Sequence, residues 1–361
     1  FKRHPVKRTF NTGAFTLEEL EFALSKISNN KACGPDNVCP EMLKIPELRD
    51  DVLNLCNHLL TTGDTPKEAI TTFFSMIPKP GGNTTEPSGW RYIALMSYVT
   101  KLYDKLLLNR LVPLLDPLLR NEQNGFRHKR STLQHALHLK LIYEELQHRK
   151  KQSGVFLFVD YSNAFPSVSV NAISAALRSF HVPPPLIKAI LKLYSGHKGI
   201  VKNNDGLSKE FDITAGVLQG DTLAPFLFDL VLDCILRKTF SKETSNGLQF
   251  SHHLHDLDFA DDIVLIASTA KEAQRRLIRL AKISRLCGLE INLKKTKFML
   301  LGNHPPASIS IGGTKLERVD DYKYLGVHFN TSTDIKIRPA QAWKAVMKFS
   351  PVWKSSTICE D

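Results

Sequence analysis

The chain has 361 residues, of which 42% are hydrophobic and 23% charged, so it has the composition of a globular protein with a sizeable core. Lysine plus arginine exceed aspartate plus glutamate by 48 − 36 = 12, which favours a polyanionic partner such as nucleic acid. There is no apolar run long enough to span a membrane, and no signal peptide. Because its cysteines form no C-x-x-C pair, a zinc ribbon and a disulfide-stapled fold are disfavoured. The chain begins at Phe1, and we expect it to be a piece of a longer protein.

The first 154 residues are predicted to be mainly helical. Thr16 and Glu19 form a capping-box pattern, so a helix should begin after Thr16. The other elements predicted here are a helix at 41–62, a strand at 73–77, and helices at 98–115 and 132–149.

From Gly154 onwards the pattern changes to strands mixed with helices. Residues 155–160 form an apolar run typical of a buried strand. The elements predicted after it are helices at 169–180 and 186–195, a hairpin at 204–206, a helix at 223–238, a hairpin around 261–262, a helix at 270–287, and strands near 289–301 and 322–329. This order predicts an α+β fold in which helices pack on one face of an antiparallel sheet.

Three aspartates mark the candidate chemistry. Asp261 and Asp262 lie between two apolar runs, where a tight hairpin would carry them, and Asp160 ends the predicted strand at 155–160. Carboxylates at such strand ends suit Mg²⁺, which shares oxygen ligands with substrate phosphates. They indicate two-metal phosphoryl transfer. The alternative is a plain turn, because aspartate is a common turn residue.

The boxes around these aspartates carry a family resemblance. They are, in chain order, 34–36, 77–79, 90–93, 123–132, 158–165, 216–225, 259–262, 288–297 and 324–326. In this order and spacing they resemble the reverse transcriptases of non-LTR (LINE-like) retrotransposons, over roughly residues 15–330.

The resemblance implies roles for the acidic and aromatic residues. Asp160 and Asp261 would hold two Mg²⁺ ions, with Mn²⁺ as a substitute, and Asp262 would lie close by, toward the primer end. Phe165 would be the steric gate that rejects a 2′-hydroxyl; its alternative is core packing. Lys295 would be the general acid that protonates pyrophosphate, or else a basic residue of an edge strand.

Further residues would contact nucleotide, template or primer. Gln219 and Gly220 would begin a helix at which template and incoming nucleotide approach the backbone closely. Arg91 and Arg127 would hold the triphosphate or template, and Arg130 the template; their alternative is a solvated surface. The primer grip would be the turn made by Tyr324, Leu325 and Gly326.

Two other clusters are interpreted as non-catalytic. Arg275, Arg276 and Arg279 are expected on one solvated face of the helix at 270–287. The histidines at 252, 253 and 255, near Asp256 and Asp258, alternate poorly for a transition-metal site, and we expect none there.

The resulting expectation is a right-hand polymerase with its thumb largely missing. Residues 1–154 would be an N-terminal extension and fingers, 155–330 the palm with interleaved fingers elements, and 331–361 the start of the thumb or connection. Its partners would be an RNA template, a DNA primer or target, and dNTPs, without a membrane. An endonuclease would lie in the missing part of the polypeptide. The family places such a protein in nucleus and cytoplasm as a ribonucleoprotein. The alternatives are a catalytically decayed nucleic-acid-binding relic, an RNA-dependent RNA polymerase and, less favoured, a metal-dependent nuclease.

Overall fold

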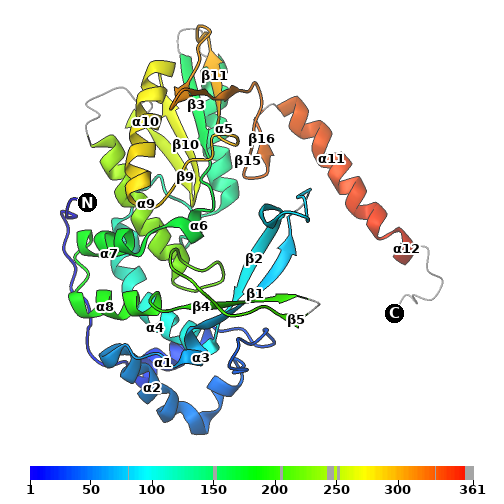
Figure 1. The fold of residues 1–361 in the computed structure, drawn as a ribbon. Helices are drawn as coiled ribbons and strands as arrows, with labels where there is room; N and C mark the ends of the chain where they lie inside the picture. The colour runs from blue at the N-terminus through cyan, green and yellow to red at the C-terminus, as the bar shows by residue number, and fades with distance from the viewer. Residues whose placement is uncertain are drawn as a thin grey trace.

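The computed structural model describes residues 1–79, 81–148, 153–203, 206–241, 248–249, 253–329 and 331–353. The described chain is built around two β-sheets (Figure 1), a central one in the upper part of the view and a second one below it. The N-terminal arm runs along the left side of Figure 1, and helix α11 (Thr331–Lys348) extends on the right.

Five of the described strands form the central sheet, in the order β14-β11-β3-β10-β9. Their bounds are Ser153–Val159 for β3, Asp256–Phe259 for β9, Asp262–Ala267 for β10, Lys297–Gly302 for β11 and Glu317–Arg318 for β14. Strand β3 is antiparallel to both of its neighbours, β10 and β11. Residues 154–159 are buried on both faces, which explains why this strand is an uninterrupted apolar run.

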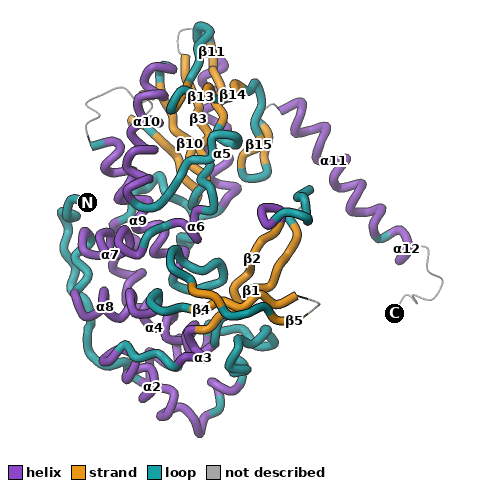
Figure 2. The backbone as a smooth tube through the Cα atoms, viewed as in Figure 1, coloured by secondary structure: helices purple, strands orange, loops and turns teal. Residues whose placement is uncertain are grey.

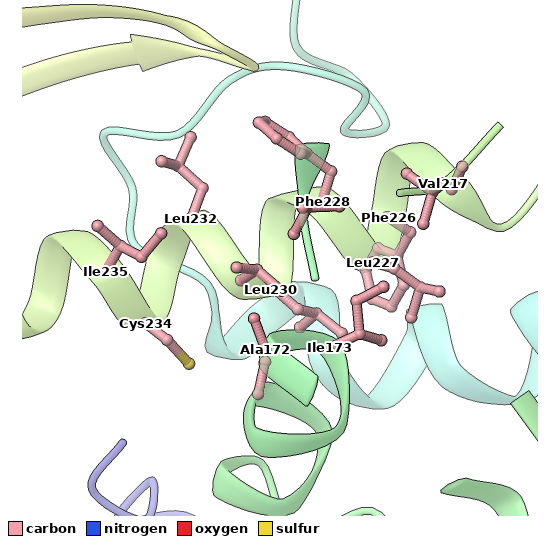
Figure 3. Close-up of a cluster of buried hydrophobic side chains, with 14 of the residues drawn as sticks. Ala172, Ile173, Val217, Phe226, Leu227, Phe228, Leu230, Leu232, Cys234 and Ile235 are labelled. Carbon is pink, nitrogen blue, oxygen red and sulfur yellow. The ribbon is translucent and has the colours of Figure 1, made fainter. Parts of the chain in front are cut away.

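Helices cover both faces of the central sheet. Helices α9 (Ala224–Phe240) and α10 (Ala270–Leu286) share one apolar cluster with Val155 and Leu157 of β3. Helix α7 (Val170–Ser179) packs on α9, and Figure 3 shows apolar side chains of α9 gathered near Ala172 and Ile173.

The opposite face of the sheet is covered as well. The alternate residues of β3, Phe156 and Phe158, pack with Leu139 and Leu146 of α5 (Thr132–His148) and with Phe329. The expectation of helices on one face is therefore incomplete, because this second row of large apolar side chains must also be removed from water.

The second sheet joins two distant parts of the chain. It contains β1 (Thr71–Pro78), β2 (Trp90–Leu95), β4 (Lys198–Asn203), β5 (Gly206–Leu207) and β6 (Phe211–Asp212). Strand β1 pairs antiparallel with β2 and parallel with β4. The predicted hairpin at 204–206 is flanked by the antiparallel pair Asn203 and Gly206, while residues 204 and 205 lie outside the described ranges.

The N-terminal helices follow the sequence signals, with one exception. The capping box of Thr16 and Glu19 opens α1 (Leu17–Ser25) as predicted, and α4 spans Tyr98–Leu115. The helix predicted at 41–62 is wrong in its first part, where two 3-10 turns, Met42–Lys44 and Pro46–Leu48, precede α2 (Arg49–Thr62). Pro46 lacks an N–H and keeps the preceding Ile45 extended, so one helix cannot run through.

The remaining elements are short. They are α3 (Lys67–Ile70), the 3-10 turns Pro87–Gly89 and Asp116–Leu118, α6 (Ala164–Ser167), α8 (Pro184–Leu193), β7 (Leu248–Gln249), β8 (His253–Leu254), β12 (Ser310–Ile311), β13 (Thr314–Lys315), β15 (Lys323–Tyr324), β16 (Val327–His328) and α12 (Ser350–Trp353). Helix α11 follows the β15–β16 hairpin and then extends away from the sheets (Figure 2). Asp334 Oδ1 of α11 accepts a hydrogen bond of 3.2 Å from the backbone N–H of His328 in that hairpin. None of the described helices is long and apolar enough to cross a bilayer.

The expectation of three solvated arginines on α10 is wrong for Arg276. This side chain is completely buried, donates to Glu272 Oε1 at 2.6 Å, and also donates to the carbonyl of Ile266. Arg279 is half-buried and donates to the carbonyl of Lys238, whereas Arg275 is exposed. A buried guanidinium is stable only because acceptors on the sheet and on its own helix surround it.

Candidate active site

The structure brings the three candidate aspartates together. Asp160 follows the last residue of β3, and Asp262 is the first residue of β10. Because Val159 pairs with Ile263, Asp160 and Asp262 occupy the next position of the same antiparallel ladder. Asp261 lies in the two-residue turn between the paired residues Phe259 and Asp262, so the predicted hairpin is confirmed.

Burial raises the pKa of all three carboxylates, and neighbouring carboxylates add to the shift for Asp261 and Asp262. Burial, followed by the charge of Asp160, raises the pKa of Asp261 above its usual value. Burial, followed by the charges of Asp261 and Asp160, raises the pKa of Asp262 to about 6. Asp262 keeps an exposed side chain, so water screens part of this repulsion. Burial also raises the pKa of Asp160, and Lys295 opposes that shift.

The donor set fits a hard divalent cation that shares its ligands with a substrate. Oδ1 of Asp160 is buried and accepts no hydrogen bond from the described residues, and the ammonium of Lys295 lies 3.5 Å from it. No group of three or more histidine, cysteine, aspartate or glutamate side chains among the described residues could hold an ion unaided. An ion here would need oxygens from water or phosphate, which is how Mg²⁺ is commonly bound.

The turn that carries Asp261 is held from one side by the segment 122–125. Ala260 has φ +56°, which is unusual for a residue with a side chain, and its N–H donates to Oε1 of the buried Gln123 at 3.0 Å. The same oxygen accepts from the N–H of Gly125 at 2.7 Å. A Cβ on Gly125 would lie 2.2 Å from the nitrogen of Ala260, so only glycine permits this approach. The backbone of Asn124 also donates to Asp258 at 2.9 Å.

The turn is also held by Tyr324. The tyrosine hydroxyl donates to the backbone carbonyl of Asp262 at 3.1 Å. Nε2 of His135 lies 3.1 Å from that hydroxyl, and Nδ1 lies 2.9 Å from the amide nitrogen of Asn124. Burial lowers the pKa of His135 to about 4, so the ring is neutral; the network assigns the proton to Nε2. Leu325 (φ +47°) and Gly326 (φ +85°) form the turn after Tyr324.

A buried ion cluster stabilises the strand before the turn. Arg120 donates to Asp256 and to Asp258, each at 2.5 Å, and its Nε lies 3.7 Å from Asp233. Asp256 and Asp258 therefore neutralise an arginine, and His255 hydrogen-bonds with Arg276 at 2.8 Å. His252 and the side chain of His253 lie outside the described part of the chain.

Phe165 belongs to an aromatic group close to the turn. Its ring stacks on Phe228 of α9, with centroids 4.9 Å apart, and meets the edge of Phe126 at 5.8 Å. The backbone of Phe165 also accepts a hydrogen bond of 2.9 Å from Val217. Phe165 is half-buried, so part of the residue remains accessible to solvent.

Two predicted contacts are corrected by the structure. Helix α9 begins at Ala224, so Gln219 and Gly220 lie in the turn before it and do not begin the helix. Gly220 has φ +121°, and a Cβ there would lie 2.6 Å from the carbonyl oxygen of Ala94 in β2. This glycine serves the contact between the turn and the second sheet, which the backbone of Gln219 reinforces by accepting from Ala94 at 2.8 Å.

Arg127 is not free to bind a triphosphate. Its guanidinium donates to Asp116 Oδ1 at 2.8 Å and to the carbonyls of Arg120 and Gln123 at 2.8 and 3.0 Å. Its side chain is only 6% exposed, so it is a structural residue of the segment that holds the turn. Arg91, in contrast, is exposed on β2, and Arg130 is exposed with one hydrogen bond of 3.2 Å to Asn124.

Sequence reasoning missed Gln123, Arg120 and His135 as parts of this site. Gln123 belongs to the box at 123–132, but nothing in its local pattern indicates a contact with Ala260, 137 residues away in the sequence. The local sequence around Arg120 does not indicate its ion pairs either, because their carboxylates lie on β9, far along the chain.

The raised pKa of Asp262 predicts a pH-dependent effect on stability. Because its folded pKa of about 6 exceeds the ordinary 3.8, ionisation of Asp262 destabilises the folded state increasingly as pH rises between these values. Without divalent cations, Asp262→Asn should raise the thermal unfolding midpoint, and more at pH 8 than at pH 5. Thermal unfolding followed by circular dichroism measures this, with the exposed Asp64→Asn as control. An equal gain at both pH values would contradict the raised pKa.

Several known proteins are similar to this chain in sequence. The family model described as "Reverse transcriptase (RNA-dependent DNA polymerase)" matches residues 77–329. The Pol polyprotein of the type-2 retrotransposable element R2DM of Drosophila melanogaster is 27% identical over 354 residues, which is 94% of this chain and 32% of that protein. The Nasonia vitripennis R2 polyprotein is 27% identical over 85% of this chain and 30% of its own length. The chain thus spans about a third of these relatives.

A third relative and two solved structures complete the comparison. The probable RNA-directed DNA polymerase from transposon BS of Drosophila melanogaster is 27% identical over 90% of this chain and 36% of that protein. Apo telomerase of Candida tropicalis is 14% identical over 77% of this chain and 65% of that one, with a TM-score of 0.46. Telomerase of the same organism with a fragment of telomeric RNA is 15% identical over 78% of this chain and 48% of that one, with a TM-score of 0.48. By the extent of the family match, this chain belongs to the reverse transcriptase (RNA-dependent DNA polymerase) family, and its curated relatives are non-LTR retrotransposon polymerases.

Proposed function

We propose that this chain is the polymerase core of a non-LTR retrotransposon and copies RNA into DNA. In this reaction a primer 3′-hydroxyl attacks the α-phosphorus of a dNTP, a new phosphodiester bond forms, and pyrophosphate leaves. The observation that carries the proposal is the meeting of Asp160, Asp261 and Asp262 at the ends of β3 and β10, inside the stretch matched by the family.

We infer that the carboxylates hold two Mg²⁺ ions, or Mn²⁺ in their place, with Asp160 and Asp261 as ligands and Asp262 toward the primer end. The family implies divalent-metal use in general, and the unbonded Oδ1 of Asp160 is consistent with a metal ligand. Bound ions would activate the hydroxyl and neutralise charge on the leaving oxygens. The ammonium of Lys295 lies 3.5 Å from Asp160, which supports the proposal that Lys295 would give a proton to the leaving pyrophosphate.

The remaining candidate contacts are assigned by position. We propose that Phe165 lies under the sugar of the incoming nucleotide and that Gln219 lines the nucleotide site next to the close backbone contact of Gly220. The exposed Arg91 and Arg130 would contact triphosphate or template, and the turn of Tyr324, Leu325 and Gly326 would hold the primer. Arg127 is left out, because its guanidinium is already bound.

The parts of the chain then have the following functions. Residues 1–154 and the second sheet would form the N-terminal extension and fingers, residues 155–330 the palm, and residues from 331 the start of the thumb. An RNA template, a DNA primer or target and dNTPs would be the partners. An endonuclease would lie in the two thirds of the relatives' length that this chain does not span. The protein would act as a ribonucleoprotein in nucleus and cytoplasm.

Primer extension tests the proposed function. With an RNA template, a DNA primer, Mg²⁺ and dNTPs, the chain should extend the primer, and Asp261→Asn should abolish extension while still binding the hybrid. Asp64→Asn, an exposed carboxylate change far from the site, should extend normally. The unchanged chain could bind the hybrid without extending the primer. If a longer chain that continues beyond residue 361 also binds without extending, the proposal is rejected in favour of a decayed binding protein.

Phe165 is expected to select deoxynucleotides. Phe165→Ala should raise the relative kcat/KM for ribonucleotides by about tenfold or more, because the ring that would collide with the 2′-hydroxyl is gone. Single-nucleotide incorporation with dTTP and UTP measures this ratio. Phe126→Ala removes the other edge of the same aromatic group and should leave the ratio nearly unchanged. If Phe165→Ala rejects ribonucleotides as well as the unchanged chain does, the assignment as gate is wrong.

Gln123 is expected to position Asp261 through the backbone of Ala260. Gln123→Leu should lower kcat by roughly tenfold to a hundredfold, because a small displacement of the turn misplaces a ligand. The KM for dNTP should change little, since Gln123 is buried away from solvent. Gln123→Glu keeps the accepting oxygen and should recover most of the activity. Steady-state kinetics that showed equal losses for both variants would contradict a positioning role through this hydrogen bond.

A further inference from the structure

A basic groove lies on the other side of the molecule from the β1–β2 hairpin and α11. It has a volume of about 880 Å³ and lies between the N-terminal arm and the segment from α7 to α8. In Figure 1 the arm, α7 and α8 are on the left, whereas β1, β2 and α11 are on the right. None of its lining residues belongs to the candidate active site.

The charge of this groove is entirely positive. Five exposed cationic side chains contribute to its walls: Arg3, Lys7, Arg178, Lys188 and Lys192. None of the five forms an ion pair with a carboxylate among the described residues, although the protein contains 36 acidic residues. No aspartate or glutamate lines the groove. A set of unpaired cations around one concave surface attracts a polyanion.

The floor between these cations is apolar. Val182, Pro183, Pro184, Ile187 and Leu191 line it. Lys188 and Lys192 lie four residues apart on α8 and therefore project from the same face of the helix. Such a surface offers apolar contact to bases and riboses while cations bind phosphates, which suits a single strand, whereas a duplex keeps its bases stacked inside.

The wall made by the N-terminal arm is fixed in place. The N–H of His4 donates to the carbonyl of Ser179 at 2.7 Å, and Nε2 of His181 lies 2.7 Å from the carbonyl of His4. The ring of His4 also stacks on Phe180, with centroids 5.3 Å apart. These contacts hold Arg3 and Lys7 over α7 and α8, so the groove exists before any ligand binds.

We propose that this groove binds single-stranded RNA, as a second binding surface that holds template RNA outside the polymerase site. The proposal rests on the proposed function for the identity of the strand. The charge and the apolar floor carry the single-strand assignment. The groove would retain the long template while the hybrid moves through the active site, so that binding is divided between two surfaces.

The test measures binding of a labelled, unstructured single-stranded RNA by fluorescence anisotropy. The polymerase site is kept occupied by a saturating, unlabelled short RNA–DNA hybrid. The variant is Lys7→Gln/Lys188→Gln/Lys192→Gln. Its matched control is Lys271→Gln/Lys282→Gln/Lys315→Gln, which removes the same charge from exposed lysines elsewhere.

The expected result follows from counterion release. Each phosphate contact contributes a slope of about 0.7 in log K against log salt for a single strand. Loss of three contacts should therefore reduce the slope by about 2 and weaken binding by roughly fifty-fold near 0.15 M salt. The control should bind as the unchanged chain does, and both variants should extend a primer on the short hybrid normally.

Three outcomes would overturn the proposal. They are unchanged binding by the groove variant, an equal loss in groove variant and control, and an equal loss for labelled duplex RNA. Failure of the proposed function is seen separately, because it is decided by primer extension with Asp261→Asn and not by this binding assay.

Discussion

Mutual repulsion among three carboxylates is the constraint that organises this structure. Asp160, Asp261 and Asp262 lie at the ends of two paired strands, and burial together with neighbouring carboxylates raises the pKa of Asp261 and Asp262. Without contacts from other parts of the chain, a two-residue turn would relax so that these charges separate. It is prevented from doing so by Gln123, which binds the N–H of Ala260, and by Tyr324, which binds the carbonyl of Asp262. Lys295 supplies the only cation for which an ion pair with Asp160 is found among the described residues.

The segment 116–127 works as one clamp on that turn. Arg120 reaches the side chains of Asp256 and Asp258 in β9, and Gln123 reaches the turn that follows. Arg127 binds Asp116 and the carbonyls of Arg120 and Gln123, so it fixes the clamp itself. Removing one partner of a buried ion pair is strongly destabilising. The ion pairs of Arg120 with Asp256 and Asp258 therefore fix the geometry of the edge strand β9. Arg127, for which the family resemblance implied phosphate binding, thus acts on the site only indirectly, through Arg120 and Gln123.

What could be predicted from the sequence was set by local periodicity. The apolar run at 155–159 and the turn at 260–261 place Asp160 and Asp261 at strand ends without further information. The start of α9 could have been placed better, because Pro225 is tolerated only in the first turn of a helix and so excludes a start at Gln219. The contacts between the clamp and the sheet could not be predicted, since they join residues more than a hundred positions apart. The burial of Arg276 was not predicted for another reason, because a run of arginines on a helix does not show which of them faces the sheet.

The distribution of charge connects the two proposed surfaces. The chain carries a net charge of +12, yet its candidate active site is locally acidic. A polyanionic template cannot be attracted by the carboxylates, so its affinity must come from cations placed elsewhere, such as Arg91 on β2 and the unpaired lysines of the basic groove. Because these lysines and arginines lie away from the carboxylates, most template phosphates would bind outside the acidic site. Inside the site, a bound divalent metal ion would be the link between carboxylate and phosphate oxygens. A basic chain with an acidic centre is therefore what the proposed chemistry requires, since carboxylates would hold the metal and cations the nucleic acid.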